Sequence, residues 1–404
     1  MHGSALEGVR IADFTWVWAG PYATMLLAYM GAEVIKIESR TRVDSARLGS
    51  ITTGQVSTNL DASSVFNNVN LNKLGVTLDL SRPKGVELAK RIVRISDVVA
   101  ENMRPGAMAR LGLSYEALVQ IKPDIIMLSS SAFGATGPYR EYVGYAPHFS
   151  AFSGLAYATG YPDGEPNILT GSTDIRSATT SAFAILAALN FRQHTGQGQY
   201  IDLSSSETLS VLIGEILMDY TMNHRQPSRC GNRDAIMAPH NCYRCKGEDK
   251  WVSLAVATDQ EWEALCQAMG NPEWTRDELF SDAYSRWQNQ EHLDRLIEQW
   301  TVNYSHYEVM ERLQASGVAA MPSFSAEELF ADPHLRERKA ATEVEHPVMG
   351  KQIVLNPPWK LSATPAKIER AGPLLGEHNE YVFGQLLGMP KQEITQLIED
   401  KVIY

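Results

Sequence analysis

The sequence is short of cysteine, of long apolar runs and of basic charge. Only 4 of its 404 residues are cysteines, too few and too unevenly spaced for a disulfide framework in a chain of this size. No run approaches the roughly 20 consecutive apolar residues of a membrane-spanning helix. The first ten residues, MHGSALEGVR, lack the charged start and apolar stretch of a signal peptide. We therefore expect a cytoplasmic protein with free thiols and no membrane partner.

The charge balance bears on the class of partner. Asp and Glu number 47 against 36 Lys and Arg, which gives a formal net charge of −11. A nucleic-acid-binding protein usually presents a basic face, so we expect no nucleic-acid partner. A local basic pocket for a phosphorylated ligand is compatible with an acidic protein. The length predicts two or more domains.

Short apolar runs alternate with longer amphipathic runs from residue 8 onward. This alternation is typical of βα units around a parallel sheet, so we predict an α/β fold with a Rossmann-like sheet. One long helix should follow Asp174 and end at Gly196, and Gly31 should end an earlier one. The predicted strands are 9–14, 33–38, 76–80, 97–101, 124–130 and 199–203, and the other predicted helices are 21–30 and 85–95.

The amino-acid composition of the sequence changes near Arg225. A polar segment containing cysteine and proline precedes a strand predicted at 251–255 and helical segments rich in tryptophan. We predict a smaller α+β domain over 225–317. The large Rossmann-like domain would then comprise 1–224 and 318–404, with 318–324, 353–361 and 390–400 returning to it as strand and helix.

The loop after the first predicted strand reads Trp16-Val17-Trp18-Ala19-Gly20-Pro21. Loops at this position in α/β sheets often bind phosphorylated ligands. This one is not a G-x-G-x-x-G sequence, which disfavours a nicotinamide cofactor. Its two tryptophans suggest the wall of an apolar or aromatic ligand pocket, while plain core packing remains open as an alternative.

The residues alone give little support for a metal or a charged catalytic group. Cys242 and Cys245 form a C-x-x-C pair with only His240 nearby, whereas structural zinc needs about four ligands, so we predict no metal site. Asp174 follows Gly-Ser-Thr directly before the long helix. A carboxylate at such a place is most often an N-cap, which is the interpretation that the residues alone favour.

Seven segments, in order, resemble the family III CoA-transferases of the CaiB/BaiF type, which include formyl-CoA:oxalate and carnitine CoA-transferases and, as relatives, the α-methylacyl-CoA racemases. The segments are LEGVRIADFT, AGPYATMLLAYMGAEVIKIE, FNNVNLNKLGVTLDL, DVVAENMRPGAMARLGL, FGATGPY, RQHTGQGQYIDLS and PLLGEH. They extend from about residue 6 to 378. The resemblance implies an interlocked dimer, either of two copies or with a homologous chain. It also implies that an acyl-CoA and a free carboxylic acid are the substrates, with no tightly bound cofactor.

The resemblance also implies roles for individual residues. Asp174 matches the family's catalytic aspartate, which would form anhydride and aspartyl-CoA thioester intermediates. Arg110 would pair with a CoA phosphate, since a guanidinium offers bidentate, charge-assisted hydrogen bonds. Carried over by position, the CoA contacts are Val17, Ala19, Arg40, Lys73, Leu78, Asn102, Met103, Arg110 and Leu111.

Two departures from the formyl-CoA:oxalate pattern bear on the acceptor. Trp18 stands where that enzyme has a glutamine, and its glycine-rich covering loop is absent here, so we do not expect oxalate. We predict instead that Trp16 and Trp18 line a pocket for a bulky or aromatic acid, such as an aryl- or alkylsuccinate of aromatic degradation. Tyr145 would help to shape or polarise that site, and succinyl-CoA is a candidate donor.

Three rival interpretations remain at this point. A racemase would use a histidine with Asp174 as an acid/base pair, but Tyr145 holds that histidine's place and His148 lies three residues further on. A non-catalytic CoA-binding subunit would have little reason to keep Asp174. A nicotinamide-dependent oxidoreductase lacks its glycine fingerprint. The sequence therefore predicts a CoA-transferase with Asp174 as its nucleophile.

Overall fold

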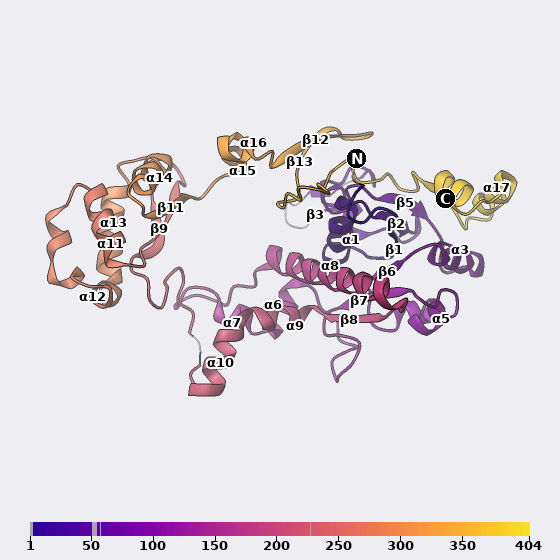
Figure 1. The fold of residues 1–404 in the computed structure, drawn as a ribbon, viewed down its shortest axis with the longest axis horizontal. Helices are drawn as coiled ribbons and strands as arrows, with labels where there is room; N and C mark the ends of the chain where they lie inside the picture. Colours follow the sequence, from indigo (N-terminus) through magenta and orange to yellow (C-terminus); the bar gives the residue numbers. More distant parts are fainter. Residues whose placement is uncertain (1–2, 51–54, 57, 227) are drawn as a thin grey trace. The chain divides into compact units, whose positions relative to one another are not determined.

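The computed structural model describes residues 3–50, 55–56, 58–226 and 228–404, and the chain divides into two compact units (Figure 1). Unit 1 comprises Met1–Ala156, Ile168–Arg225 and Leu335–Tyr404, and unit 2 comprises Tyr157–Asn167 and Gln226–His334. Among the described residues, no helix is both long enough and apolar enough to cross a membrane.

Unit 1 is built on a six-stranded sheet in which all neighbouring strands are parallel. The spatial order is β5-β2-β1-β6-β7-β8. This arrangement confirms the predicted α/β fold with a parallel sheet. The chain passes from β1 to one side of the sheet and returns beside β1 as β6, so the loops after β1 and β6 meet where the strand order reverses. The strands are β1 (Arg10–Asp13), β2 (Glu33–Glu38), β5 (Leu74–Thr77), β6 (Val98–Glu101), β7 (Ile126–Ser131) and β8 (Tyr200–Ser204).

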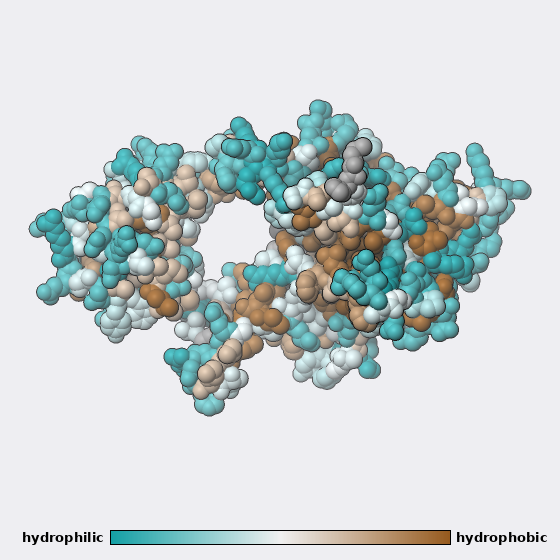
Figure 2. All heavy atoms as spheres, viewed as in Figure 1, coloured by the Kyte–Doolittle hydropathy of each residue, from teal (hydrophilic) through white to brown (hydrophobic). Residues whose placement is uncertain are grey.

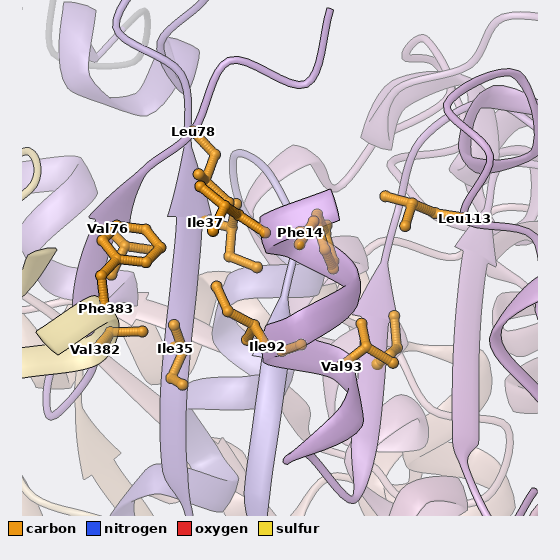
Figure 3. Close-up of a cluster of buried hydrophobic side chains, with 14 of the residues drawn as sticks. Phe14, Ile35, Ile37, Val76, Leu78, Ile92, Val93, Leu113, Val382 and Phe383 are labelled. Atoms are coloured by element: carbon orange, nitrogen blue, oxygen red, sulfur yellow. The ribbon is translucent and has the colours of Figure 1, made fainter. Parts of the chain in front are cut away.

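Two hydrophobic cores lie on the two faces of this sheet. Because side chains alternate along a strand, Ala12 and Ile35 enter one core while Ile11 and Val34 enter the other. The first core also contains residues of α3 (Pro83–Arg94) and the C-terminal pair Val382 and Phe383 (Figure 3). The second contains residues of α1 (Ala19–Tyr29) and α8 (Thr170–Thr195). Gly31 and Gly196 follow α1 and α8 with φ of 97° and 73°, as glycines that end helices do.

The C-terminal segment closes the β5 edge of the sheet. The Gly75 N–H donates to His378 Nδ1 at 3.1 Å, and the His378 N–H donates to the Gly75 carbonyl at 2.9 Å. Further along, the Thr77 N–H donates to Asn379 Oδ1 and the Asp79 N–H donates to the Val402 carbonyl. The final helix, α17 (Lys391–Glu399), therefore belongs to unit 1 and adds Leu397 to the first core.

Helix α10 (Gly214–Asn223) of unit 1 has no buried residue. Its Leu217, Met218, Tyr220 and Met222 are all exposed, with Met222 71% exposed. Where Figure 1 places α10, Figure 2 shows apolar side chains at the surface beside hydrophilic ones. The remaining elements of unit 1 are η1 (Ser45–Leu48), β3 (Gly49–Ser50), β4 (Gln55–Val56), α2 (Ser64–Val69), α4 (Ala107–Arg110), α5 (Tyr115–Val119), α6 (Ala146–Phe152), α9 (Ser205–Ser210), η2 (Val211–Ile213), β12 (Ala341–His346), β13 (Gly350–Leu355) and η5 (Glu380–Leu386).

Unit 2 contains a three-stranded antiparallel sheet of order β11-β10-β9. Its strands are β9 (His240–Arg244), β10 (Trp251–Ala255) and β11 (Ala319–Pro322), and its helices include α11 (Asp259–Ala268), α12 (Ala283–Gln288), α13 (Gln290–Thr301), α14 (His306–Ala315) and α15 (Ala326–Ala331). We expected a strand over 318–324 to return to the large domain. The strand exists, but it pairs with β10 and places Ala320 in the small core, so the chain returns to unit 1 later, at Leu335.

Candidate active site

The loop after β1 is fastened to the residue that follows β6. The Trp16 N–H donates to Asn102 Oδ1 at 2.7 Å, and Asn102 Nδ2 donates to the Trp16 carbonyl at 2.9 Å. Gly20 permits this close approach, because a Cβ at that position would lie 2.5 Å from the Thr15 Cβ and 2.9 Å from the Asn102 Cγ. The structure thus brings together two segments that the sequence selected separately, at the carboxyl edge where parallel α/β sheets bind ligands.

Lys73 lies beneath this loop rather than at a ligand-binding surface. Its side chain is fully buried, and its Nζ donates to Asp13 Oδ2 at 2.9 Å, to the Pro21 carbonyl at 2.8 Å and to Asn70 Oδ1 at 2.9 Å. An ammonium group has three protons to donate, so all of them are used within the protein. Burial lowers the pKa of Lys73 to about 8. Lys73 therefore supports the loop from below, and its Nζ has no proton left to donate to CoA.

The other predicted CoA contacts divide into buried and exposed groups. Leu78 is fully buried in the first core, beside Ile37 (Figure 3), so only its backbone could reach a ligand. Ala19 is buried in the first turn of α1. Asn102, Met103 and Leu111 are partly exposed. Arg40 and Arg110 are exposed, and neither forms an ion pair with another described residue, which leaves both guanidinium groups available for phosphate.

Two further basic residues stand near the predicted contacts. The guanidinium carbon of Arg42 lies 5.2 Å from the centroid of the Trp16 ring, a distance at which a cation is attracted to an aromatic face. Arg140 lines a cavity of about 340 Å³ together with Arg110. Sequence reasoning did not select either residue. For Arg42 the available signal was its position two residues after Arg40; for Arg140 it was the motif FGATGPY directly before it.

The same cavity contains a carboxyl group in an apolar setting. Glu101 ends β6, accepts a hydrogen bond from the Met103 N–H at 2.7 Å and is also hydrogen-bonded to the Ser129 hydroxyl. Burial raises the pKa of Glu101 to about 7. Glu101 thus fixes the backbone of the loop that carries Asn102 and Met103. Its role was not predicted, because nothing local in the sequence shows that a strand-end glutamate will be buried.

Asp174 is not an N-cap, contrary to the interpretation that its local sequence favours. Helix α8 begins at Thr170, so Asp174 lies in the helix itself, about one turn from its start. No other described residue donates a hydrogen bond to its carboxylate, and burial alone raises the pKa of Asp174 to about 6. At neutral pH the group is therefore mostly ionised, partly shielded from water and not neutralised by a described cation. A perturbed carboxyl group of this kind is a candidate nucleophile.

Tyr145 and His148 occupy the start of α6. The Tyr145 side chain is 68% exposed, and its backbone N–H donates to His148 Nδ1 at 3.2 Å. His148 thus serves the cap of this helix. Helix α8, which carries Asp174, packs against both α6 and α1. Helix α6 directly follows Tyr145 and helix α1 directly follows Trp18, so both predicted substrate residues precede helices that contact the helix of Asp174. No hydrogen bond among the described residues joins the side chains of Tyr145 or Trp18 to Asp174.

The C-x-x-C pair Cys242 and Cys245 lies on β9 and directly after it. Cys242 Sγ lies 3.2 Å from the Ser253 hydroxyl, and Cys245 is buried. Within the described ranges, no group of three or more His, Cys, Asp or Glu side chains is arranged to hold a metal ion.

A profile of CoA-transferase family III matches residues 6–379. The chain belongs to CoA-transferase family III. Succinyl-CoA:D-citramalate CoA-transferase of Chloroflexus aurantiacus is 34% identical over 406 residues, which cover 98% of this chain and 98% of that one. The beta subunit of succinyl-CoA:L-malate CoA-transferase of the same organism is 34% identical over 405 residues, again 98% of both chains. Formyl-CoA:oxalate CoA-transferase of a Bradyrhizobium species is 33% identical over 417 residues, 97% of this chain and 96% of that one.

Among solved structures, a CAIB/BAIF family protein from Brucella suis superimposes with a TM-score of 0.86 at 30% identity, covering 95% of this chain and 100% of that one. The family resemblance read from the sequence is therefore confirmed. This family III member is a CoA-transferase, an enzyme class whose substrate is a CoA thioester and which uses no tightly bound cofactor.

Proposed function

We propose that this family III CoA-transferase moves CoA from succinyl-CoA to a carboxylic acid acceptor, with Asp174 as the covalent nucleophile. The observation that carries the proposal is the state of Asp174. Its carboxylate is partly buried, accepts no hydrogen bond from another described residue and has a pKa raised to about 6. A carboxylate without donors keeps its electron density for attack on an acyl carbon. The donor is suggested by the relatives whose names begin with succinyl-CoA.

The proposed chemistry needs no group other than this carboxylate and the substrates. An Asp174 oxygen attacks the thioester carbonyl, the C–S bond breaks, and the products are a mixed anhydride and CoA thiolate. The thiolate attacks the aspartyl carbonyl, which releases the donor acid and leaves an aspartyl-CoA thioester. The acceptor carboxylate attacks this thioester, forming a second anhydride and freeing the thiolate again. Attack of the thiolate on the acceptor's carbonyl gives the new acyl-CoA and regenerates Asp174.

We place the acceptor against Trp16 and Trp18. Both rings are partly exposed beside the loop fixed by Asn102, and an aromatic wall suits a bulky or aromatic acid. Arg42, which lies over the Trp16 ring, is exposed and could pair with a second carboxylate of the acceptor. This position keeps a smaller dicarboxylic acid, the acceptor class in the names of two relatives, as the second candidate.

We further propose that the active assembly is a dimer, formed with a second copy or with a homologous chain. Helix α10 leaves its apolar side chains uncovered in the single chain, and two of the similar proteins are named as alpha and beta subunits of one enzyme. Sedimentation of the purified chain tests this. A monomer that is active by itself would contradict the dimer proposal.

The covalent mechanism is tested by intact-protein mass spectrometry after incubation with succinyl-CoA, followed by hydroxylamine trapping and peptide mapping. We expect an adduct on the peptide that contains Asp174. The matched control is Asp97→Asn, which changes an aspartate at the opposite edge of the sheet and should leave the adduct in place. An active enzyme that yields no Asp174 adduct with succinyl-CoA or any other acyl-CoA tested would refute the mechanism.

A further inference from the structure

Val17, in the middle of the loop after β1, has a strained backbone. Its φ is 65°, in the left-handed region that β-branched residues rarely adopt because the side chain crowds the backbone. Such a conformation persists only where the surrounding structure imposes it, and it occurs most often at functional sites. The question is therefore which contacts hold Val17 in place.

A buried ion pair supplies those contacts. The Val17 N–H donates to both carboxylate oxygens of Asp44, at 3.0 and 3.2 Å. Lys36 Nζ donates to Asp44 Oδ2 at 2.9 Å and also to the Thr15 carbonyl. The side chains of Lys36 and Asp44 are both 0% exposed. The Lys36–Asp44 pair thus binds the loop on both sides of Trp16. Lys36 binds the Thr15 carbonyl before it, and Asp44 binds the Val17 N–H after it.

Other backbone groups of the loop are also hydrogen-bonded within the protein. Asp13 accepts the Thr15 N–H at 2.9 Å, and Asn102 pairs with both the N–H and the carbonyl of Trp16. The loop backbone therefore has its conformation before any ligand arrives, while the side chains of Trp16, Val17 and Trp18 remain accessible. Holding a site in its productive geometry in advance lowers the cost of binding and of reaching the transition state.

We propose that Lys36 and Asp44 are positioning residues of the transferase reaction. By binding the Val17 N–H and the Thr15 carbonyl, the pair imposes the left-handed turn at Val17 and so sets the directions of Trp16 and Trp18 at the acyl site. The proposal rests on the proposed function for the role of the two tryptophans. It predicts a specific coupling, because a glycine at position 17 adopts the left-handed turn without strain and should need Asp44 less.

The test is a double-mutant cycle between positions 17 and 44. Asp44→Ala removes the acceptor of the Val17 N–H, and we expect kcat/KM to fall at least about tenfold. In the Val17→Gly background, we expect the same change at position 44 to cost less than about threefold. If Asp44→Ala is insoluble, Asp44→Leu, which has about the same shape as Asp but no acceptor for the Val17 N–H, replaces it in the cycle. A tenfold loss that shrinks in the glycine background supports the proposal, whereas a smaller loss, or an equal loss in both backgrounds, overturns it.

Two controls distinguish the positioning role from an effect of losing any ion pair and from the proposed covalent mechanism. Asp97→Asn breaks the Arg192–Asp97 ion pair at the amino edge of the sheet and should leave kcat/KM within about twofold, which shows that losing an ion pair elsewhere in the sheet does not by itself lower activity. Titration of the same cycle variants with CoA alone gives a readout that does not depend on covalent chemistry. If Asp174→Ala keeps its activity while the cycle shows coupling in CoA affinity, the proposed mechanism fails but the positioning role stands. Coupling absent from both readouts overturns the positioning role alone.

Discussion

The ion pairs at the carboxyl ends of the large sheet's strands differ in exposure from those at the amino ends. At the carboxyl edge, Lys36–Asp44 and Lys73–Asp13 are ion pairs whose four side chains are all 0% exposed. At the amino edge, the partners of the Arg10–Glu33 and Arg192–Asp97 pairs are 16–29% exposed. Removing charge from water is costly, and a fully buried pair is seldom the most stable way to fill a core. The buried pairs lie beneath the loop after β1, whose geometry matters for ligand binding. We infer that these pairs serve to hold that loop in place rather than to maximise the stability of the fold.

The largest expected effect separates the reacting carboxylate from an ordinary one. We expect Asp174→Ala to lower kcat/KM by about a thousandfold or more, because no alternative nucleophile is proposed. The same measurement on Asp97→Asn should stay within about twofold of the parent. If Asp174→Ala folds normally and its kcat/KM stays within about tenfold of the parent, the covalent mechanism is contradicted.

The next effect compares the two edges in stability. Lys73→Met leaves the Asp13 carboxylate buried without its cation and should lower the free energy of unfolding by about 3–5 kcal/mol. Arg10→Met breaks a partly exposed pair and should cost only about 1 kcal/mol. Urea unfolding of both variants measures the difference. Equal costs at the two edges would remove the contrast on which the comparison depends.

A pH series tests the environment of Asp174. Burial raises the pKa of Asp174 from 3.8 to about 6, so the folded state binds this proton more tightly than the unfolded state. Ionisation of Asp174 therefore lowers the free energy of unfolding. The contribution of Asp174 to the free energy of unfolding should therefore fall as pH rises from about 4 to 6. Asp174→Asn should exceed the parent by about 1–2 kcal/mol above pH 7 and lose this advantage below pH 4.

The same pKa sets the expected pH profile of catalysis. Because only the ionised carboxylate attacks, kcat/KM should decline below about pH 6 and level off above it. A parent enzyme with flat stability and flat activity across this range would show that Asp174 is better solvated than its burial indicates.

The smallest effect concerns the acceptor. Trp18→Gln removes an aromatic surface from the proposed acyl pocket and should raise the KM of aromatic acids about tenfold relative to small dicarboxylic acids. Initial rates with paired acceptors measure this preference. An unchanged ratio would place the acceptor elsewhere and leave Trp18 as part of the loop packing.

Local patterns in the sequence predicted most of the large sheet. Apolar runs located the six strands, with ends at most three residues from those observed, and Gly31 and Gly196 marked two helix ends because glycine accepts the conformation that ends a helix. The strand at 319–322 was also found, but it was assigned to the large domain, whereas it pairs with β10 in unit 2. An alternating run shows which side of a strand is buried, whereas its pairing partner depends on contacts far along the chain.

The candidate site was predictable only as far as motifs reach. Motif matches selected Asp174 and Asn102, and the position of the loop selected Trp16. Lys73 was also assigned to the ligand, although its Nζ donates to three acceptors within the protein, one of them Asp13, 60 positions away in the chain. The strain at Val17, the burial of Asp44 and the start of α8 before Asp174 left no local signal either. Each depends on which distant segment covers the residue, and a single sequence does not record that.

The contact between the C-terminal segment and β5 has a consequence for how chains can associate. An exposed edge strand is a template onto which a strand of another molecule can add. Here the β5 N–H groups of Gly75 and Thr77 are already taken by His378 and Asn379, so this edge offers no free ladder for a foreign strand. Deleting the chain beyond residue 370 should therefore do more than remove α17, because it would also uncover a sheet edge and make the protein prone to aggregate.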